Sequence, residues 1–202
     1  MVDAFIEWDV AQATLKGENK SGDGYLVKPF AKNVLVAVVD GLGHGDEAAA
    51  AAKIAVDVLD ANAHDSVISL FKRSHEALRK SRGVVMSMAL VNGLDATLTW
   101  TGVGNVEGLV VRADPEIKPE KESLLMRPGV LGSSLPTLYA SIIQMMPGDT
   151  FVFATDGIRS GFDEIVNSYD PPKEIATAIV SKYSKGSDDA LVLVARYRGF
   201  EP

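Results

Sequence analysis

The stretch from Val34 to Asp46, VLVAVVDGLGHGD, passes from six apolar residues into Asp40 and then into alternating glycines. Apolar, β-branched residues without polar alternation are typical of a strand that is covered on both faces. The following run, DEAAAAAKIAVDVLDANA (46–63), predicts a helix, because Asp46 and Glu47 favour the positive end of a helix dipole. The stretch therefore predicts a buried strand, a glycine turn and a helix, with a carboxylate at the end of the strand.

The segments around this stretch predict further strands and two more helices. The second and third helices are expected in DSVISLFKRSHEALRKS (65–81) and PPKEIATAIVSKYS (171–184). The segment DPEIKPEKESLLMRPGVLGSS (114–134) has no clear period and is interpreted as a long surface excursion. Further strands are expected at 4–15, 24–30, 83–91, 96–104, 106–114, 137–146, 150–157 and 188–197.

Composition limits the classes of function. The chain has 202 residues, 47% of them hydrophobic, and carries 27 acidic against 20 basic residues for a net charge of -7, which argues against nucleic-acid binding. It has no cysteine, which excludes disulfides, thiolate zinc sites and cysteine nucleophiles. The first ten residues, MVDAFIEWDV, do not resemble a secretory signal, and no apolar run is long enough to span a bilayer. We expect a soluble, cytoplasmic protein without a membrane partner.

Four aspartates adjoin predicted strands. Asp23 precedes one strand, Asp40 and Asp156 end two others, and Asp188 precedes the last. Strands of one sandwich can bring such ends together, and converging carboxylates repel one another unless a cation lies between them. Clustered oxygens are the ligands that magnesium, manganese and calcium bind, so the pattern indicates a metal site. The alternative is that aspartates beside glycines are ordinary turn residues, and this is our interpretation of Asp95 and Asp149.

Six of these segments, in this order, resemble the motifs of the metal-dependent protein phosphatases, the type 2C or PPM family, in its bacterial SpoIIE-like branch. They are SGDGYLV, VVDGLGHGDEAA, GVVMSMALV, LTWTGVGN, MPGDTFVFATDGI and SDDALVLVARY. The resemblance covers nearly the whole chain and implies a single phosphatase domain over residues 1–202. Together with the two-sided strand and the helix pair, it predicts an α+β fold: a four-layer α-β-β-α sandwich of two mostly antiparallel sheets flanked by helices.

The resemblance also implies roles for the aspartates. Asp40, Asp156 and Asp188 would be the catalytic carboxylates and would bind two divalent cations, Mn²⁺ or Mg²⁺. The backbone carbonyl of Gly41 would bind one ion and Asp23 would act near it, and a hydroxide that bridges the ions would attack phosphoserine or phosphothreonine directly. Within the branch, the short chain and a terminal motif with Ala190 and Leu191 in place of methionine and threonine resemble the stand-alone stressosome phosphatases. That narrower resemblance implies phosphorylated regulatory proteins as partners, in particular STAS-domain stressosome proteins.

The sequence departs from the eukaryotic members of the family at two points. Leu42 stands where many of them have a histidine after the central Asp-Gly, and His44, two residues on, is interpreted as structural. No motif supplies their phosphate-binding arginine; Arg159 is either a substrate contact or a surface charge. His64 and His75 are interpreted as solvated surface residues, and Trp8 and Trp100 as core residues.

The sequence bears on three functions other than a metal-dependent phosphatase. GLGHG has the wrong spacing for a dinucleotide-binding loop and no alternating βαβ series follows it. A haloacid-dehalogenase-type phosphatase needs a second aspartate at position 42, which is Leu42. The remaining alternative is a catalytically silent phosphatase fold that binds phosphoproteins as a scaffold.

Overall fold

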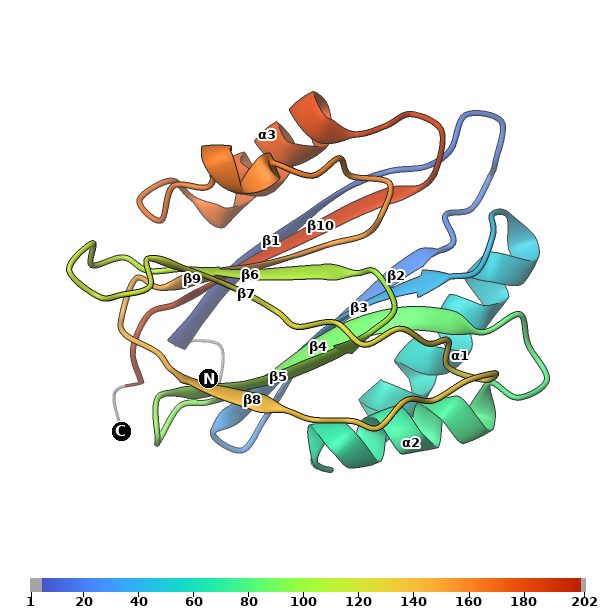
Figure 1. Cartoon of the computed structure of the whole chain (residues 1–202), viewed down its shortest axis with the longest axis horizontal. Helices are drawn as coiled ribbons and strands as arrows, with labels where there is room; N and C mark the ends of the chain where they lie inside the picture. The colour runs from blue at the N-terminus through green and yellow to red at the C-terminus, as the bar shows by residue number, and fades with distance from the viewer. Residues whose placement is uncertain (1–4, 201–202) are drawn as a thin grey trace.

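Two antiparallel five-stranded sheets lie face to face at the centre of the computed structural model, which describes residues 5–200 (Figure 1). In spatial order, the first sheet contains β1 (Ile6–Ala13), β10 (Ala190–Tyr197), β9 (Thr150–Ala154), β6 (Glu107–Val111) and β7 (Lys121–Ser123). The second contains β2 (Asp23–Phe30), β3 (Asn33–Gly41), β4 (Val84–Asn92), β5 (Thr97–Val103) and β8 (Ser141–Gln144). The helical elements are α1 (Asp46–Ala61), α2 (Val67–Ala77), α3 (Pro172–Tyr183) and the short 3₁₀ helix η2 (Phe162–Ile165).

Strand β3 is buried on both faces, as its sequence predicts. Val34, Val36 and Val38 face the other sheet, whereas the alternate residues Leu35 and Val39 pack under α1 and α2. The alternation follows from the period of two in a strand, and it needs apolar residues at every position because both faces are covered. The long apolar run therefore places β3 at the centre of the molecule, with Asp40 at its end.

Helices cover the outer face of each sheet (Figure 1). Helix α1 buries its small residues Ala48, Ala51 and Ala55 against the β2–β3 sheet, which lets its backbone come close to the strands. Helix α3 buries Ile175 and Ile179 against the β1–β10 sheet. Since three separate apolar cores fill the spaces between the four layers, the predicted α-β-β-α sandwich is confirmed.

Some local predictions were wrong. The segment 114–134 is not purely a surface excursion, because it contains β7 and places Leu131 in the core beneath α2. The strand predicted at 137–146 is only four residues long. Trp100 is buried as predicted, but Trp8 is 39% exposed and packs on the ring of Tyr25 at 6.1 Å between centroids.

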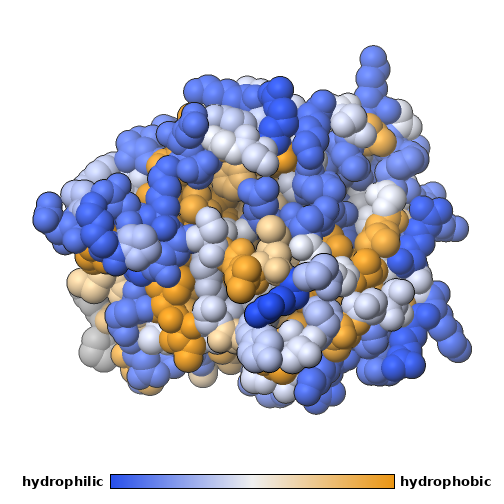
Figure 2. Space-filling view, in the orientation of Figure 1, coloured by the Kyte–Doolittle hydropathy of each residue, from blue (hydrophilic) through white to orange (hydrophobic). Residues whose placement is uncertain are grey.

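The face of the molecule drawn in Figure 2 carries hydrophilic residues around its outline and separate groups of apolar residues between them. Within residues 5–200, no helix is long and apolar enough to cross a membrane. The predicted strand at 4–15 and the domain at 1–202 both reach residues outside the described range.

Candidate active site

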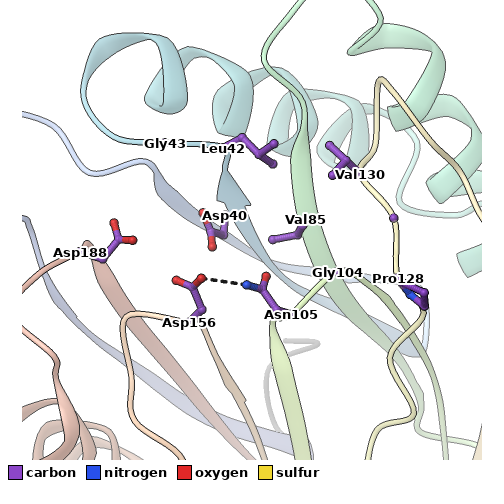
Figure 3. Close-up of a pocket in the computed structure, with 11 residues that line it drawn as sticks. Asp40, Leu42, Gly43, Val85, Gly104, Asn105, Pro128, Val130, Asp156 and Asp188 are labelled. Atoms are coloured by element: carbon purple, nitrogen blue, oxygen red, sulfur yellow. Dashed lines mark hydrogen bonds between the residues drawn. The ribbon is translucent and has the colours of Figure 1, made fainter.

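Three of the predicted aspartates line one pocket at the end of the sandwich (Figure 3). Asp40 lies at the end of β3, Asp156 follows β9, and Asp188 precedes β10, so the pocket receives carboxylates from both sheets. Its volume is about 350 Å³, and Figure 3 shows the three carboxylates facing a common space. Apolar side chains, Leu42 and Val130 among them, line the opposite wall.

Asp23 lies beside this group, outside the lining of the pocket. It is the residue opposite Asp40 in the β2–β3 register, so the two carboxylates belong to neighbouring strand ends. The hydroxyl of Thr155, in the other sheet, donates a hydrogen bond to Asp23 Oδ2 at 2.8 Å, and it accepts one from the backbone N–H of Leu191 at 2.9 Å. Thr155 therefore fixes Asp23 across the space between the two sheets.

Asp156 is oriented by the turn between β5 and β6. The side-chain amide of Asn105 donates a hydrogen bond to Asp156 Oδ2 at 2.8 Å (Figure 3). The ammonium of Lys185 donates to the backbone carbonyl of Asp156. These contacts hold the second Asp-Gly pair from two directions while leaving its carboxylate in the pocket.

The glycine turn after β3 has a packing reason. A Cβ atom on Gly41 would lie 2.2 Å from the backbone oxygen of Ala48, so only glycine allows the first turn of α1 to pack there. Gly43 and Gly45 adopt φ values of 86° and 77°, a region that favours glycine, and Gly45 is the N-cap of α1. The alternating glycines therefore bring the chain from the carboxylate directly into the helix.

His44 and Leu42 occupy different environments in this turn. Leu42 lines the pocket, in the place of the eukaryotic histidine. His44 lies outside the pocket lining, and its Nδ1 is 2.7 Å from Oε1 of Glu18 in the segment between β1 and β2.

Two other residues considered in the sequence analysis make contacts within the protein. His75, predicted to be solvated, accepts a hydrogen bond from the backbone N–H of Gly132 at 3.0 Å. Arg159 donates a hydrogen bond to the backbone carbonyl of Lys182 at the end of α3.

The electrostatics of the site favour a bound cation. The pKa of Asp40 is raised to about 8, with burial as the largest cause and the neighbouring carboxylates, Asp23 first, as the next. Burial likewise raises the pKa of Asp23 to about 7, against the opposing effect of the Thr155 hydrogen bond. Among the described residues, the pocket lining includes no lysine or arginine. A divalent cation would supply the charge that these carboxylates lack.

The donor set fits a hard, oxygen-preferring ion. Carboxylate and carbonyl oxygens are the ligands of magnesium, manganese and calcium. Within residues 5–200, no three acidic or histidine side chains form a ready-made cage, so water would have to complete the coordination.

Two residues of the site, Asn105 and Thr155, were not predicted from the sequence. Thr155 directly precedes Asp156, and Asn105 lies in the quoted motif LTWTGVGN.

Comparison with known proteins identifies the family. Residues 31–198 match the family model of Stage II sporulation protein E (SpoIIE). The chain belongs to the SpoIIE family. The motif-based recognition of the SpoIIE-like branch is thereby confirmed.

The SpoIIE-family relatives agree in sequence and in fold. Phosphoserine phosphatase RsbX of Bacillus subtilis (strain 168) is 27% identical over 156 residues, which are 76% of this chain and 75% of RsbX. A second relative is a chain from a structure of the bacterial stressosome, which is described as a modular system adapted to control secondary messenger signaling. It is 30% identical to this chain and superposes with a TM-score of 0.86. The match covers 95% of this chain and 99% of that one. The crystal structure of RsbX in complex with magnesium gives a TM-score of 0.85 at 22% identity, over 96% of each chain, and supports the fold.

These matches confirm the predicted enzyme class, a protein phosphatase of the metal-dependent PPM type, and they show a similarity to RsbX.

Proposed function

We propose that this SpoIIE-family chain hydrolyses phosphoserine or phosphothreonine in regulatory proteins, and that STAS-domain stressosome proteins are its substrates. The observation that carries the proposal is the grouping of Asp40, Asp156 and Asp188, from both sheets, around one open pocket. The substrate class is supported by the 27% identity of the chain to a phosphoserine phosphatase and by its 30% identity to a chain from a stressosome structure.

The same residues would hold two divalent cations. The carboxylates of Asp40, Asp156 and Asp188, the Gly41 carbonyl and Asp23 would hold these ions. When bound, such ions lower the pKa of water toward neutrality and neutralise phosphate oxygens. Asn105 and Thr155 orient the carboxylates of Asp156 and Asp23 through the hydrogen bonds described above. Water attacks phosphorus directly, so no side chain of the pocket needs to act as a nucleophile.

Metal titration tests this proposal. Protein treated with a chelator should release no phosphate from a phosphoserine protein, and Mn²⁺ should restore turnover at lower concentration than Mg²⁺, because manganese binds oxygen sites more tightly. Calcium should bind without comparable turnover, since its larger shell positions water poorly. Full activity in excess chelator would exclude the mechanism.

The substrate is tested separately with a panel of phosphorylated STAS-domain proteins from the same genome. We expect faster phosphate release from one or a few of them than from an unrelated phosphoserine protein. Asp95→Asn, in an exposed turn, is the matched control for substitutions of the pocket aspartates. Binding of a phosphoprotein without any release of phosphate, at saturating Mn²⁺, would instead favour the scaffold alternative.

A further inference from the structure

Asp189, the second acid of the SDD motif, is buried at 4% exposure beside Asp188. Both of its carboxylate oxygens accept backbone hydrogen bonds from the segment between β1 and β2. The N–H of Leu15 donates to Oδ1 at 2.7 Å, and the N–H of Gly22 donates to Oδ2 at 2.7 Å. Short hydrogen bonds to an ionised acceptor are among the stronger ones in proteins, so Asp189 fixes a segment that is distant in sequence.

The fixed segment leads directly into the site. The carbonyl of Gly22 accepts a hydrogen bond from the N–H of Gly41 at 3.0 Å, and the residue after Gly22 is Asp23. A Cβ on Gly22 would lie 2.9 Å from Cβ of Ala48 and 3.4 Å from Oδ2 of Asp189, so this backbone is held closely between α1 and the carboxylate.

Asp189 also contacts the second Asp-Gly pair. A Cβ on Gly157 would lie 1.8 Å from the backbone oxygen of Asp189, which shows how closely the two chain segments pack. Asp189 therefore touches the segment that follows Asp156, adjoins Asp188, and reaches Asp23 and Gly41 through Gly22. The segments with the predicted ligands thus meet Asp189 either directly or through Gly22.

We propose that Asp189 is a positioning residue of the cation site: its carboxylate holds Gly22, and through Gly22 it holds Asp23 and the Gly41 backbone at the spacing that bound cations need. This inference rests on the proposed function. An acid is needed at this position because both partners are N–H donors, whereas an asparagine would turn its own NH₂ group toward one of them. Asp189→Asn is therefore not a conservative change.

The test measures metal binding directly, by calorimetry with Mn²⁺ on chelated Asp189→Asn, with Asp95→Asn as the control. We expect the dissociation constant for Mn²⁺ to rise about 10-fold or more, as for other groups that orient metal ligands. Hydrogen exchange at the Leu15 and Gly22 amides should become faster, and the kcat at saturating Mn²⁺ should stay within about threefold of wild type. In a variant that thermal melts show to be folded at the assay temperature without metal, a loss of affinity with kcat retained is not expected from a general loss of stability.

Other results would overturn the inference. An unchanged Mn²⁺ affinity, with only a lower unfolding temperature, would make Asp189 purely structural. A kcat that saturating metal does not restore, together with fewer ions bound, would make it a direct ligand. If Asp189→Asn does not fold, Gly22→Ala tests the same link, because its Cβ would push against Ala48 while the carboxylate stays, and its Mn²⁺ affinity should fall as well.

Failure of the proposed function has a different signature. In that case the wild type would release no phosphate from any phosphoserine protein at saturating Mn²⁺, while the effect of Asp189→Asn on Mn²⁺ affinity and amide exchange would still be measurable.

Discussion

Two carboxylates at opposite ends of the sandwich, Asp149 and the half-buried Asp40, have different surroundings. Asp149 is fully buried and accepts hydrogen bonds from Arg112 at 2.8 Å, from the N–H of Ala113 at 2.9 Å and from the N–H of Met146 at 3.0 Å. Asp40 faces other carboxylates, and within the described chain no hydrogen bond lowers its pKa. Donors within the protein stabilise the negative charge of Asp149. A negative charge on Asp40 would need a cation bound from solution.

The difference shows how to separate a structural acid from a functional one. Asp149 was predicted to be a turn residue, and its complete burial with Arg112 shows that this interpretation was incomplete. A buried charge is tolerated when donors satisfy it, and an unsatisfied group that persists in a pocket indicates a site. Substitutions at the two ends should therefore have opposite effects on activity and stability.

The largest expected effect is the loss of activity in Asp40→Asn. We expect turnover to fall on the order of 10³-fold or more, because several kcal/mol of metal-dependent transition-state stabilisation would be lost. The unfolding temperature of the chelated variant should equal or exceed that of the wild type, since burial and neighbouring charges oppose an ionised Asp40. Steady-state assays and thermal melts against Asp95→Asn measure both. A destabilised variant that keeps its turnover would contradict the comparison.

Asp149→Ala should show the reverse pattern. Removal of Asp149 leaves the buried Arg112 with Glu122 as its remaining ionic partner and takes the acceptor from two backbone N–H groups, and we expect a loss of about 3–5 kcal/mol in the free energy of unfolding. The kcat per folded molecule should not change, because Asp149 lies at the far end of β9 from Asp156. Urea unfolding combined with activity per folded molecule measures both quantities. A stable variant without activity would mean that this end of the sandwich contributes to the site.

Proton linkage should distinguish the two ends in the metal-free protein. The pKa of Asp40 is raised to about 8 and that of Asp23 to about 7, burial being the largest cause at both. Between about pH 4 and pH 8 the folded state holds protons that the unfolded chain has released, so this contribution to the free energy of unfolding falls as pH rises. Denaturant titrations with chelator at pH 5.5 and 8.5 should show a smaller fall in Asp40→Asn. An equal fall in both proteins would mean that groups other than Asp40 cause the pH dependence of the free energy of unfolding.

Thr155→Val tests the hydrogen bond between the sheets. Loss of the hydroxyl should reduce Mn²⁺ affinity about 10-fold, because Asp23 is no longer fixed, while kcat at saturating metal recovers. A loss of about 1–2 kcal/mol in stability should accompany it, since the N–H of Leu191 also loses its acceptor. Calorimetry and urea unfolding measure the two effects. Thr150→Val, at the start of β9 and distant from Asp23, is the control for the effect on Mn²⁺ affinity.

The smallest effect is expected for His44→Ala. The His44 side chain is exposed, its partner Glu18 is half-buried, and His44 lies outside the pocket lining, so the kcat should fall by no more than about threefold. Assays at saturating Mn²⁺ check this value. Activity as low as that of Asp40→Asn would show that His44 acts in the reaction and that its predicted structural role is wrong.

The sequence predicted the elements whose patterns are local. The apolar run of β3, the acidic start of α1 and the apolar stripe of α2 are each determined within a few turns of chain, and all three elements form. Strand β7 was missed because it is only three residues long and pairs with β6 alone, so its sequence has no visible alternation. Leu131 was missed because its burial depends on α2, which lies far away in sequence.

The site was predictable to a similar degree. The four aspartates could be selected because each adjoins a strand, and three of them line one pocket. The contacts of Thr155 with Asp23 and of Asp189 with Gly22 could not be predicted, since they join residues more than 130 positions apart. Only the packing of one sheet on the other brings these residues together.

The pairing of β1 with β10 has a consequence for engineering the chain. The rings of Phe5 and Phe200 are 5.4 Å apart between centroids, while Asp188 lies before the first residue of the eight-residue strand β10. The two ends of the described chain are thus neighbours, roughly 25 Å from the pocket along that strand. We expect a circular permutant, with its ends joined by a short linker and new ends opened in the exposed loop at 114–120, to fold and keep its phosphatase centre.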